Sequence, residues 1–363
     1  MKKIKLTVLL MLISAVFAGN TYSQGFNSVN SPDGLYVIAV GNSGKLYRSL
    51  SSGASWISYT NGVLNMNCVT SYGDDVWIAS DNGTVYKTLK TISAVTAYGV
   101  GSSTNLYSVF FTDANTGFTC GAGGEVYKTV NGGVNWTLSN SGIPSVKLNS
   151  VNFSNSSTGR VAGNNGIIYY TSDGGANWTA ETSGTAVNLL KVRCYNDSAV
   201  AAGEYGTLLL NKGSGWTTVN TKIVTDIRGV SGKNMNDIHV CGGGGFIRNN
   251  KSGSSEFLNF ETNPMLANLT DVYFYDGNKG WAVSSMNSVI IYTSNGGTVW
   301  NMPNGANVTL SWTSKPGATG GSLGDNICEH PFNRNTVFTA FSNQIYVSRN
   351  RGENWAAVGT VMP

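Results

Sequence analysis

Residues 148–178, LNSVNFSNSSTGRVAGNNGIIYYTSDGGANW, contain the pattern that decides the fold. Four short runs rich in β-branched and aromatic residues predict strands, and the Asn, Asp, Ser and Gly residues between them are typical of turns. The third run is the easiest to follow along the chain, because it opens with a small residue and continues with an apolar and Tyr pattern. Its copies begin at Gly44, Gly83, Gly124, Gly166, Gly206, Gly245, Ser288 and Asn343.

The spacing of these copies indicates the architecture. The first six steps are 39 to 43 residues long and the last is 55. A four-stranded unit of about 40 residues is the period of a β-propeller blade, in which each small sheet stacks on its neighbours around a channel. We therefore predict an all-β propeller over residues 24–363, a single domain of eight blades with a longer connection at about 301–325. A seven-bladed ring, with the second repeat packed differently, is the alternative.

The composition agrees with a β-rich fold. The chain has 363 residues, of which 46 are Gly and only 12% are charged. Helical bundles and coiled coils need far more Ala, Leu, Glu, Lys and Arg, so this composition excludes them. The 41% of hydrophobic residues, with 9 Trp, 17 Tyr and 13 Phe, argues against disorder.

The N-terminal segment predicts export. Lys2, Lys3 and Lys5 precede an apolar run over residues 6–17, which is the pattern of a signal peptide cleaved after about residue 23. This run is too short to span a bilayer, and we expect no membrane span. Its removal leaves 20 Lys and Arg against 19 Asp and Glu, which is too little positive charge for a nucleic-acid partner. We expect a periplasmic or extracellular protein, and the sequence leaves its oligomeric state open.

Metal and cofactor sites are not expected. The five cysteines are widely spaced, lie mostly in apolar runs and show no metal-ligand spacing. We interpret them as small buried hydrophobic residues, because the spacing shows no disulfide framework. His239 and His330 are too far apart in the sequence to suggest a triad.

A turn motif follows the third run in five repeats. It has Thr or Ser, then Asp, Asn or Ser, then Gly and Trp at fixed positions, and these residue types supply turn hydrogen bonds, positive φ and apolar packing. The motif resembles the Asp-box, or BNR, repeat of sialidase-like propellers, in which it is structural. Its best copies comprise Thr129, Asn131, Gly133 and Trp136; Thr171, Asp173, Gly175 and Trp178; Asn295, Gly297 and Trp300; and Asn350, Gly352 and Trp355.

The complete repeat, as in residues 106–136, is similar to the photosystem II stability and assembly factor-like repeat. This resemblance implies a non-enzymatic propeller that binds another protein during assembly. A carbohydrate-binding or sialidase-like glycan-processing propeller is the alternative, with a glycan or cell-surface component as its partner. The Arg-Ile-Pro segment of sialidases is absent from the sequence, so we expect no glycoside hydrolase activity.

Two features depart from the repeat and are candidate binding sites. The innermost strands are mostly uncharged, but those of the fifth to seventh repeats carry Lys191, Arg193, Arg228 and Asp271, which predicts a mixed-charge patch in the channel. The long connection at about 301–325 carries Trp312 and Lys315. Insertions into a regular array often form binding loops. Structural pairing in the channel and a role of the connection in closing the ring are the alternative interpretations.

Overall fold

A computed structural model describes residues 25–60, 62–250, 259–260, 268–285 and 289–303, together with the backbone of strands at 327–330, 333–341, 344–348 and 356–360. The chain divides into two compact units, residues 1–306 and residues 307–363. The predicted signal peptide lies outside the described residues. None of the helices in these ranges is long and apolar enough to cross a membrane.

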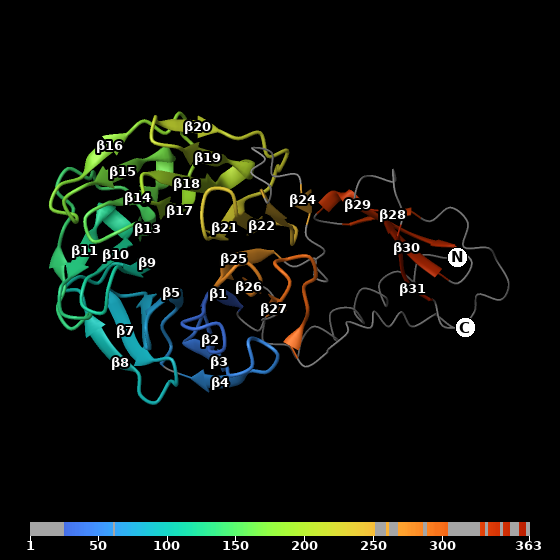
Figure 1. The fold of residues 1–363 in the computed structure, drawn as a ribbon, viewed down its shortest axis with the longest axis horizontal. Coiled ribbons are helices and arrows are strands. Elements are labelled where there is room, and N and C mark those ends of the chain that lie inside the picture. The colour runs from blue at the N-terminus through green and yellow to red at the C-terminus, as the bar shows by residue number, and fades with distance from the viewer. Residues whose placement is uncertain are drawn as a thin grey trace, which may run out of the picture. The chain divides into compact units, whose positions relative to one another are not determined.

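The described part of the first unit forms seven antiparallel sheets, arranged as the blades of a propeller. Figure 1 shows β1, β5, β9, β13, β17, β21 and β25 around the centre, with β4, β8, β16 and β20 at the rim. Each blade is a meander whose strands pair in sequence order, four per blade except for three in the described part of blade 7.

The strands of the first four blades have the following bounds: β1 Phe26–Asn30, β2 Val37–Gly41, β3 Lys45–Ser49 and β4 Ile57–Thr60 in blade 1; β5 Met66–Tyr72, β6 Asp75–Ser80, β7 Thr84–Leu89 and β8 Thr96–Gly99 in blade 2; β9 Leu106–Phe111, β10 Gly117–Gly121, β11 Val126–Thr129 and β12 Thr137–Leu138 in blade 3; β13 Leu148–Phe153, β14 Gly159–Gly163, β15 Ile168–Thr171 and β16 Thr179–Glu181 in blade 4.

The remaining strands and the short 3-10 turns complete the order: β17 Leu189–Tyr195, β18 Ser198–Gly203, β19 Leu208–Asn211 and β20 Trp216–Thr218 in blade 5; β21 Ile227–Gly232, β22 Ile238–Gly242, β23 Ile247–Asn249 and β24 Asn259–Phe260 in blade 6; β25 Leu269–Phe274, β26 Gly280–Ser284 and β27 Ile290–Thr293 in blade 7; β28 Ile327–His330, β29 Asn333–Phe341, β30 Gln344–Ser348 and β31 Ala356–Thr360 in the second unit; η1 Ala122–Gly124, η2 Asn164–Gly166 and η3 Glu204–Gly206.

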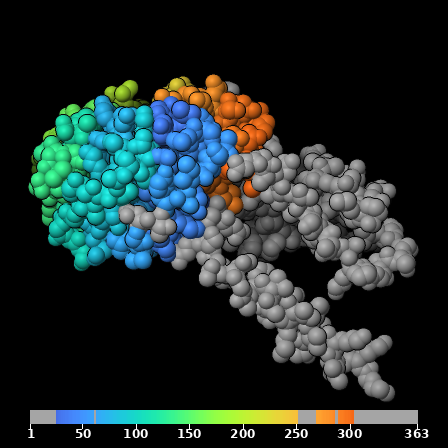
Figure 2. Space-filling model, turned by 90° about the horizontal axis from the view of Figure 1, so that it is seen from below, coloured from blue at the N-terminus to red at the C-terminus, as the bar shows by residue number. Residues whose placement is uncertain are grey.

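The count of eight blades is wrong, and the seven-bladed alternative is confirmed. The seventh blade packs directly on the first, so no sheet lies between them. Figure 2 shows atoms of these two blades side by side. The alternative named the second repeat as the irregular one, but β5–β8 is an ordinary four-stranded blade. The repeat that supplies no blade of the seven-bladed propeller is the last one, whose strands form the sheet β28–β31 of the second unit.

A β-bulge near the start of every innermost strand links the blades. In β1, for example, Phe26 pairs with Gly41 and Ser28 with Val40, so Asn27 has no partner across the strand. We call this the bulge position; its seven residues are Asn27, Asn67, Tyr107, Asn149, Leu190, Arg228 and Thr270. A bulge redirects its side chain out of the local ladder, which here allows contact with the next blade.

Four bulge-position side chains donate to the first carbonyl of the next innermost strand. Asn27 Nδ2 donates to Met66 O at 3.0 Å, and Thr270 Oγ1 donates to Phe26 O at 2.8 Å. The other two donors are Asn67, to Leu106 O, and Asn149, to Leu189 O, both at 2.8 Å. The Thr270 bond joins the last blade to the first and is thus a noncovalent closure of the ring.

The hydrophobic core lies between blades. In three of the junctions, a side chain of the second strand stacks on an aromatic ring at the end of the next innermost strand, which in turn meets a Trp edge to face. Phe118, Phe153 and Trp178 form one such set, with ring centroids 3.9 and 6.0 Å apart. The other sets are Trp77, Phe111 and Trp136, and His239, Phe274 and Trp300. Buried area of this kind is the main stabilising contribution to such a ring.

The closing bond can be tested with an isosteric substitution. Thr270→Val removes the hydroxyl that donates to Phe26 O and also lies 3.1 Å from Val283 O of its own blade. It should lower the free energy of unfolding in urea by about 1 kcal/mol, since the main-chain acceptor in blade 1 loses its donor. Thr84→Val is the control, because its hydroxyl donates only within an exposed turn, to Asn82 O at 3.2 Å. Equal effects of the two substitutions would contradict a special role for the closing bond.

Candidate functional site

One residue follows the bulge position in each innermost strand, and we call this place the ring position. It comprises Ser28, Cys68, Ser108, Ser150, Lys191, Gly229 and Asp271. Several of these side chains hydrogen-bond the next innermost strand: Ser28 Oγ accepts from Val69 N at 3.2 Å, and Ser108 Oγ accepts from Val151 N at 3.2 Å. Most of the ring position is therefore small and occupied by contacts between blades.

Lys191 and Asp271, two of the predicted channel residues, form an ion pair at this level. Lys191 Nζ lies 3.3 Å from Asp271 Oδ1, and the two side chains are 24% and 10% exposed. They come from blades 5 and 7, and the ring position of the blade between them is Gly229, so no side chain separates them there. Burial opposes the charge on Lys191, but the Asp271 carboxylate outweighs it and the pKa of the ammonium is raised.

Asp271 also joins the seventh blade to the first. Its Oδ2 accepts from Ser28 Oγ at 2.7 Å and from Val29 N at 3.3 Å. The carboxylate thus has polar partners on both oxygens. The Lys191–Asp271 pair therefore has a structural role, because Asp271 also binds blade 1.

The other two predicted channel residues lie apart from this pair. Arg228 occupies the bulge position of blade 6, and its Nη2 lies 2.9 Å from Asp226 Oδ2 on the same blade. The Arg193 guanidinium lies over the Tyr195 ring, 5.8 Å from its centroid. The structure therefore brings together two of the four residues. Trp312 and Lys315 lie outside the described residues, as does the connection beyond residue 303.

The described Asp-box residues make the same hydrogen bonds in blades 3, 4 and 7, whereas the predicted copy with Asn350, Gly352 and Trp355 lies outside the described residues. In blade 4, Thr171 Oγ1 accepts from Gly175 N at 2.9 Å and donates to Asp173 Oδ1 at 2.8 Å, while Asp173 Oδ1 accepts from Asn177 N at 3.0 Å. Blades 3 and 7 repeat this with Thr129, Asn131 and Gly133 and with Thr293, Asn295 and Gly297. In blade 4, donation from Asn177 and Thr171 lowers the pKa of Asp173 to about 2.

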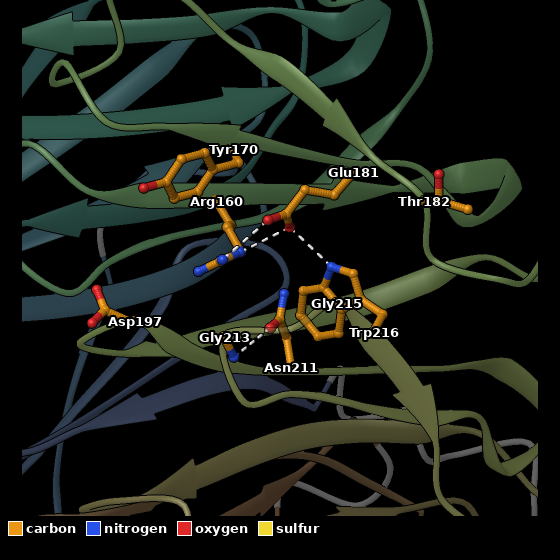
Figure 3. A pocket seen from close by; sticks show the side chains of 9 residues that line it. All are labelled: Arg160, Tyr170, Glu181, Thr182, Asp197, Asn211, Gly213, Gly215 and Trp216. Carbon is orange, nitrogen blue, oxygen red and sulfur yellow. Dashed lines mark hydrogen bonds and ion pairs between the residues drawn. The ribbon is translucent and has the colours of Figure 1, made fainter.

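A pocket of about 420 Å³ lies between blades 4 and 5, and sequence reasoning missed it. Arg160 of β14 lies at its base, 4% exposed, with Tyr170, Glu181, Asp197, Asn211 and Trp216 around it. Figure 3 shows these side chains converging from both blades. The sequence did contain a signal, since Arg160 stands where the repeats of blades 2, 3 and 7 have Trp77, Phe118 and Trp281.

Glu181 holds the Arg160 guanidinium in place. Its two oxygens accept from Arg160 Nε at 2.9 Å and Nη2 at 3.0 Å, and Oε2 also accepts from Trp216 Nε1 at 2.9 Å. Bidentate pairs of this kind are strong and fix the plane of the guanidinium. Burial acts to lower the pKa of Arg160, but Glu181 outweighs it and the pKa is raised.

Cysteine and metal chemistry finds no support in the described residues. Cys68, Cys120, Cys194 and Cys241 are all buried, and no disulfide joins them. Burial raises the pKa of Cys194 to about 11, so this thiol is neutral at physiological pH. Among the described side chains no cluster of His, Cys, Asp and Glu could hold a metal ion.

Comparison with known proteins agrees with the resemblance found in the repeats. Residues 87–183 match the family model described as photosynthesis system II assembly factor YCF48. These residues therefore carry repeats of that family, and the resemblance is confirmed over blades 2 to 4. No curated protein matches the chain.

Solved structures with TM-scores above 0.6 show the same fold at low sequence identity. YCF48 from Cyanidioschyzon merolae matches with a TM-score of 0.61 and 14% identity, over 77% of this chain and 98% of that one. The GH74 enzyme of Niastella koreensis matches with a TM-score of 0.62 and 15% identity, over 94% of this chain and 67% of that one. A YCF48 bound to a D1 peptide matches with a TM-score of 0.47 and 16% identity, over 71% and 82%.

The Lys191–Asp271 pair can be tested with a double-mutant cycle. Asp271→Ala leaves Lys191 without its counterion and should lower the free energy of unfolding by about 2–3 kcal/mol. In a Lys191→Met background the same substitution should cost only about 1 kcal/mol, from the lost bonds to Ser28 and Val29. Urea denaturation of the four proteins measures the difference. Additive costs would show that the two charges are not coupled.

The Asp173 turn should make stability depend on acid pH. Because the folded pKa of about 2 lies below the unfolded value of 3.8, the ionised form stabilises the protein above pH 4 and this contribution is lost as the pH falls toward 2. Asp173→Asn, which places in blade 4 the residue that blades 3 and 7 have, should make the melting temperature fall less between pH 4 and 2, although the lowered pKa values of Asp33, Asp113 and Asp276 keep part of the fall. Unchanged acid dependence in the variant would contradict this role.

Proposed function

We propose that this propeller, whose residues 87–183 carry repeats of the photosystem II assembly factor family, is an exported binding module that holds another protein during assembly of a larger complex. The family match is the observation that carries the proposal, since the matched family is described as an assembly factor. The Lys2, Lys3 and Lys5 cluster before an apolar run supports export. Nothing in the matched repeats points to a photosynthetic partner for this chain.

The chemistry of the described surface supports binding in preference to catalysis. The pocket between blades 4 and 5 is lined by a single arginine, which is already paired with Glu181. A sialidase-like site needs several arginines for a substrate carboxylate. The likeness to the GH74 enzyme, at 15% identity, concerns the fold alone. We therefore assign no enzymatic activity to the chain.

The partner can be captured in the cells that make the protein. A photo-crosslinking amino acid at Thr182, an exposed residue lining the pocket, should give a discrete covalent adduct with another polypeptide. The same probe at Thr137, which is exposed on blade 3, is the matched control for position. Mass spectrometry identifies the adduct, and protease or glycosidase treatment shows whether its mass is protein or glycan.

Three outcomes decide this proposal. A protein adduct at Thr182 that is absent at Thr137 supports it. Adducts that only a glycosidase removes would replace it with the carbohydrate-binding alternative. The absence of any polypeptide adduct at Thr182, Arg228 and the 301–325 connection would overturn it. Export is tested separately, because a mature N-terminus between Gly19 and Gln24 is expected and a retained Met1 on exported protein would contradict it.

A further inference from the structure

The pocket between blades 4 and 5 exists because blade 5 has a shortened turn. The Asp-box turn of blade 4 spans eight residues, Thr171 to Trp178, whereas the equivalent turn of blade 5 spans six, Asn211 to Trp216. In blade 4 the box glycine, Gly175, lies so close to Phe118 of the previous blade that an added Cβ would come within 2.9 Å of the ring. The turn of blade 5 is two residues shorter and has no such glycine packed over the side chain of the previous blade, Arg160.

The packing beneath the short turn is also changed. At the junction of blades 3 and 4, Phe118 stacks on Phe153, but at the junction of blades 4 and 5 the same positions hold Arg160 and Cys194. A thiol fills much less space than a phenyl ring, and Trp216 is only half-buried where Trp178 is 5% exposed. The loss of two turn residues and of one ring together account for the space.

One buried nitrogen in this space has no partner among the described residues. Glu181 accepts from Nε and Nη2 of Arg160, whereas Arg160 Nη1 is buried without a hydrogen bond. Cys194 lies beside the guanidinium, but its thiol donates to Asn152 O at 3.3 Å and is a weak acceptor. A buried donor without an acceptor is costly, so an oxygen acceptor from a ligand would be favourable here.

The remaining polar groups provide one more donor and one acceptor. Asn211 is buried, and its Oδ1 accepts from Gly213 N at 2.8 Å, which leaves its amide nitrogen to donate. Figure 3 shows the Asn211 amide nitrogen turned toward the Arg160–Glu181 pair, and it shows Asp197 on the side of the guanidinium that carries the unbonded nitrogen. The exposed Asp197 carboxylate can only accept.

The charges favour an uncharged ligand. Arg160 is neutralised by Glu181, and Asp197 adds one negative charge, so the pocket is negative overall. A carboxylate would be repelled by Asp197, and an ammonium would leave the Arg160 and Asn211 donors unsatisfied. A carboxamide has a carbonyl for the two donors and an N–H for Asp197.

We infer that this pocket recognises the side-chain carboxamide of an Asn or Gln residue on the partner polypeptide. The inference rests on the proposed function and names the group by which the partner is held. The carbonyl oxygen accepts from Arg160 Nη1 and Asn211 Nδ2, and the amide nitrogen donates to Asp197. The Tyr170 and Trp216 rings lie against the Arg160 guanidinium, 4.8 and 5.8 Å from it, and hold it in place for this contact. Binding of one such side chain is weak, and it selects among partner segments rather than supplying all the affinity.

The test uses small probes and the full chain. N-acetyl-glutamine N-methylamide, whose only primary carboxamide is in the side chain, is titrated into protein carrying ¹⁵N-labelled tryptophan, and the indole signal of Trp216 is followed by NMR. It should shift in a saturable manner, and N-acetyl-glutamate N-methylamide, which has no primary carboxamide, should bind about fivefold more weakly or worse, because of its charge. Asp197→Asn should abolish that preference. Asp74→Asn is the matched control, since it changes an acid on the corresponding hairpin of blade 2, far from the pocket.

A second variant and a glycan probe keep the outcomes distinct. Asn211→Asp keeps the acceptor for Gly213 N but removes the donor, and should weaken binding of the glutamine probe about fivefold or more. The other indole signals report whether each variant is folded. No shift of Trp216, equal binding of both probes to the wild type, or tighter binding of N-acetylglucosamine than of the glutamine probe would overturn the inference.

Failure of this inference and failure of the proposed function look different. A polypeptide adduct at Thr182 without any response to the glutamine probe overturns the carboxamide assignment alone. A selective response to the probe without any polypeptide adduct in cells overturns the proposed function alone.

Discussion

The bulge near the start of each innermost strand is the constraint on which the ring depends. By leaving one residue unpaired, it turns a side chain toward the next blade, where Asn27, Asn67, Asn149 and Thr270 donate to a main-chain carbonyl. A blade alone cannot bury its faces. These hydrogen bonds, together with the aromatic side chains packed between neighbouring blades, must therefore hold each sheet at a fixed distance from the next. Thr270 and Asp271 join the last blade to the first through hydrogen bonds of the same kind.

Closure explains why counting repeats gave the wrong number of blades. The repeat spacing correctly predicted four-stranded units, and the last copy does form a sheet, β28–β31. What the spacing cannot show is which sheets share a ring, because that depends on bonds between residues some 240 positions apart, such as Thr270 to Phe26. The local pattern specifies a blade, whereas the ring size is set by contacts between its first and last members.

The candidate sites also differ in how much of them could be predicted from the local sequence pattern. The charges at Lys191 and Asp271 were visible in the sequence as departures from a small, uncharged position, and the structure pairs them across Gly229. The ion pair of Arg228 with Asp226 was not predicted, because the repeat does not show that the bulge turns this side chain out of the ladder. Prediction of the pocket from the sequence would have required three departures from the repeat to be combined. They are Arg160, Cys194 and the short Asn211–Trp216 turn, which lie in two different repeats.

In this repeat protein, a specific site arises at a junction where the packing between two blades differs from the pattern of the other junctions. In blades 1, 3 and 4 the box glycine lies against an aromatic ring of the preceding blade, which leaves no room for a ligand there. Replacement of the ring pair by Arg160 and Cys194 would cost stability if it left a charge unpaired, but Glu181 neutralises the guanidinium and also binds the Trp216 indole. The rigid blades on either side then hold one free donor, Arg160 Nη1, in a fixed place. The position of that donor makes this junction, rather than the paired charges of the channel, the part of the described surface best suited to selecting a ligand.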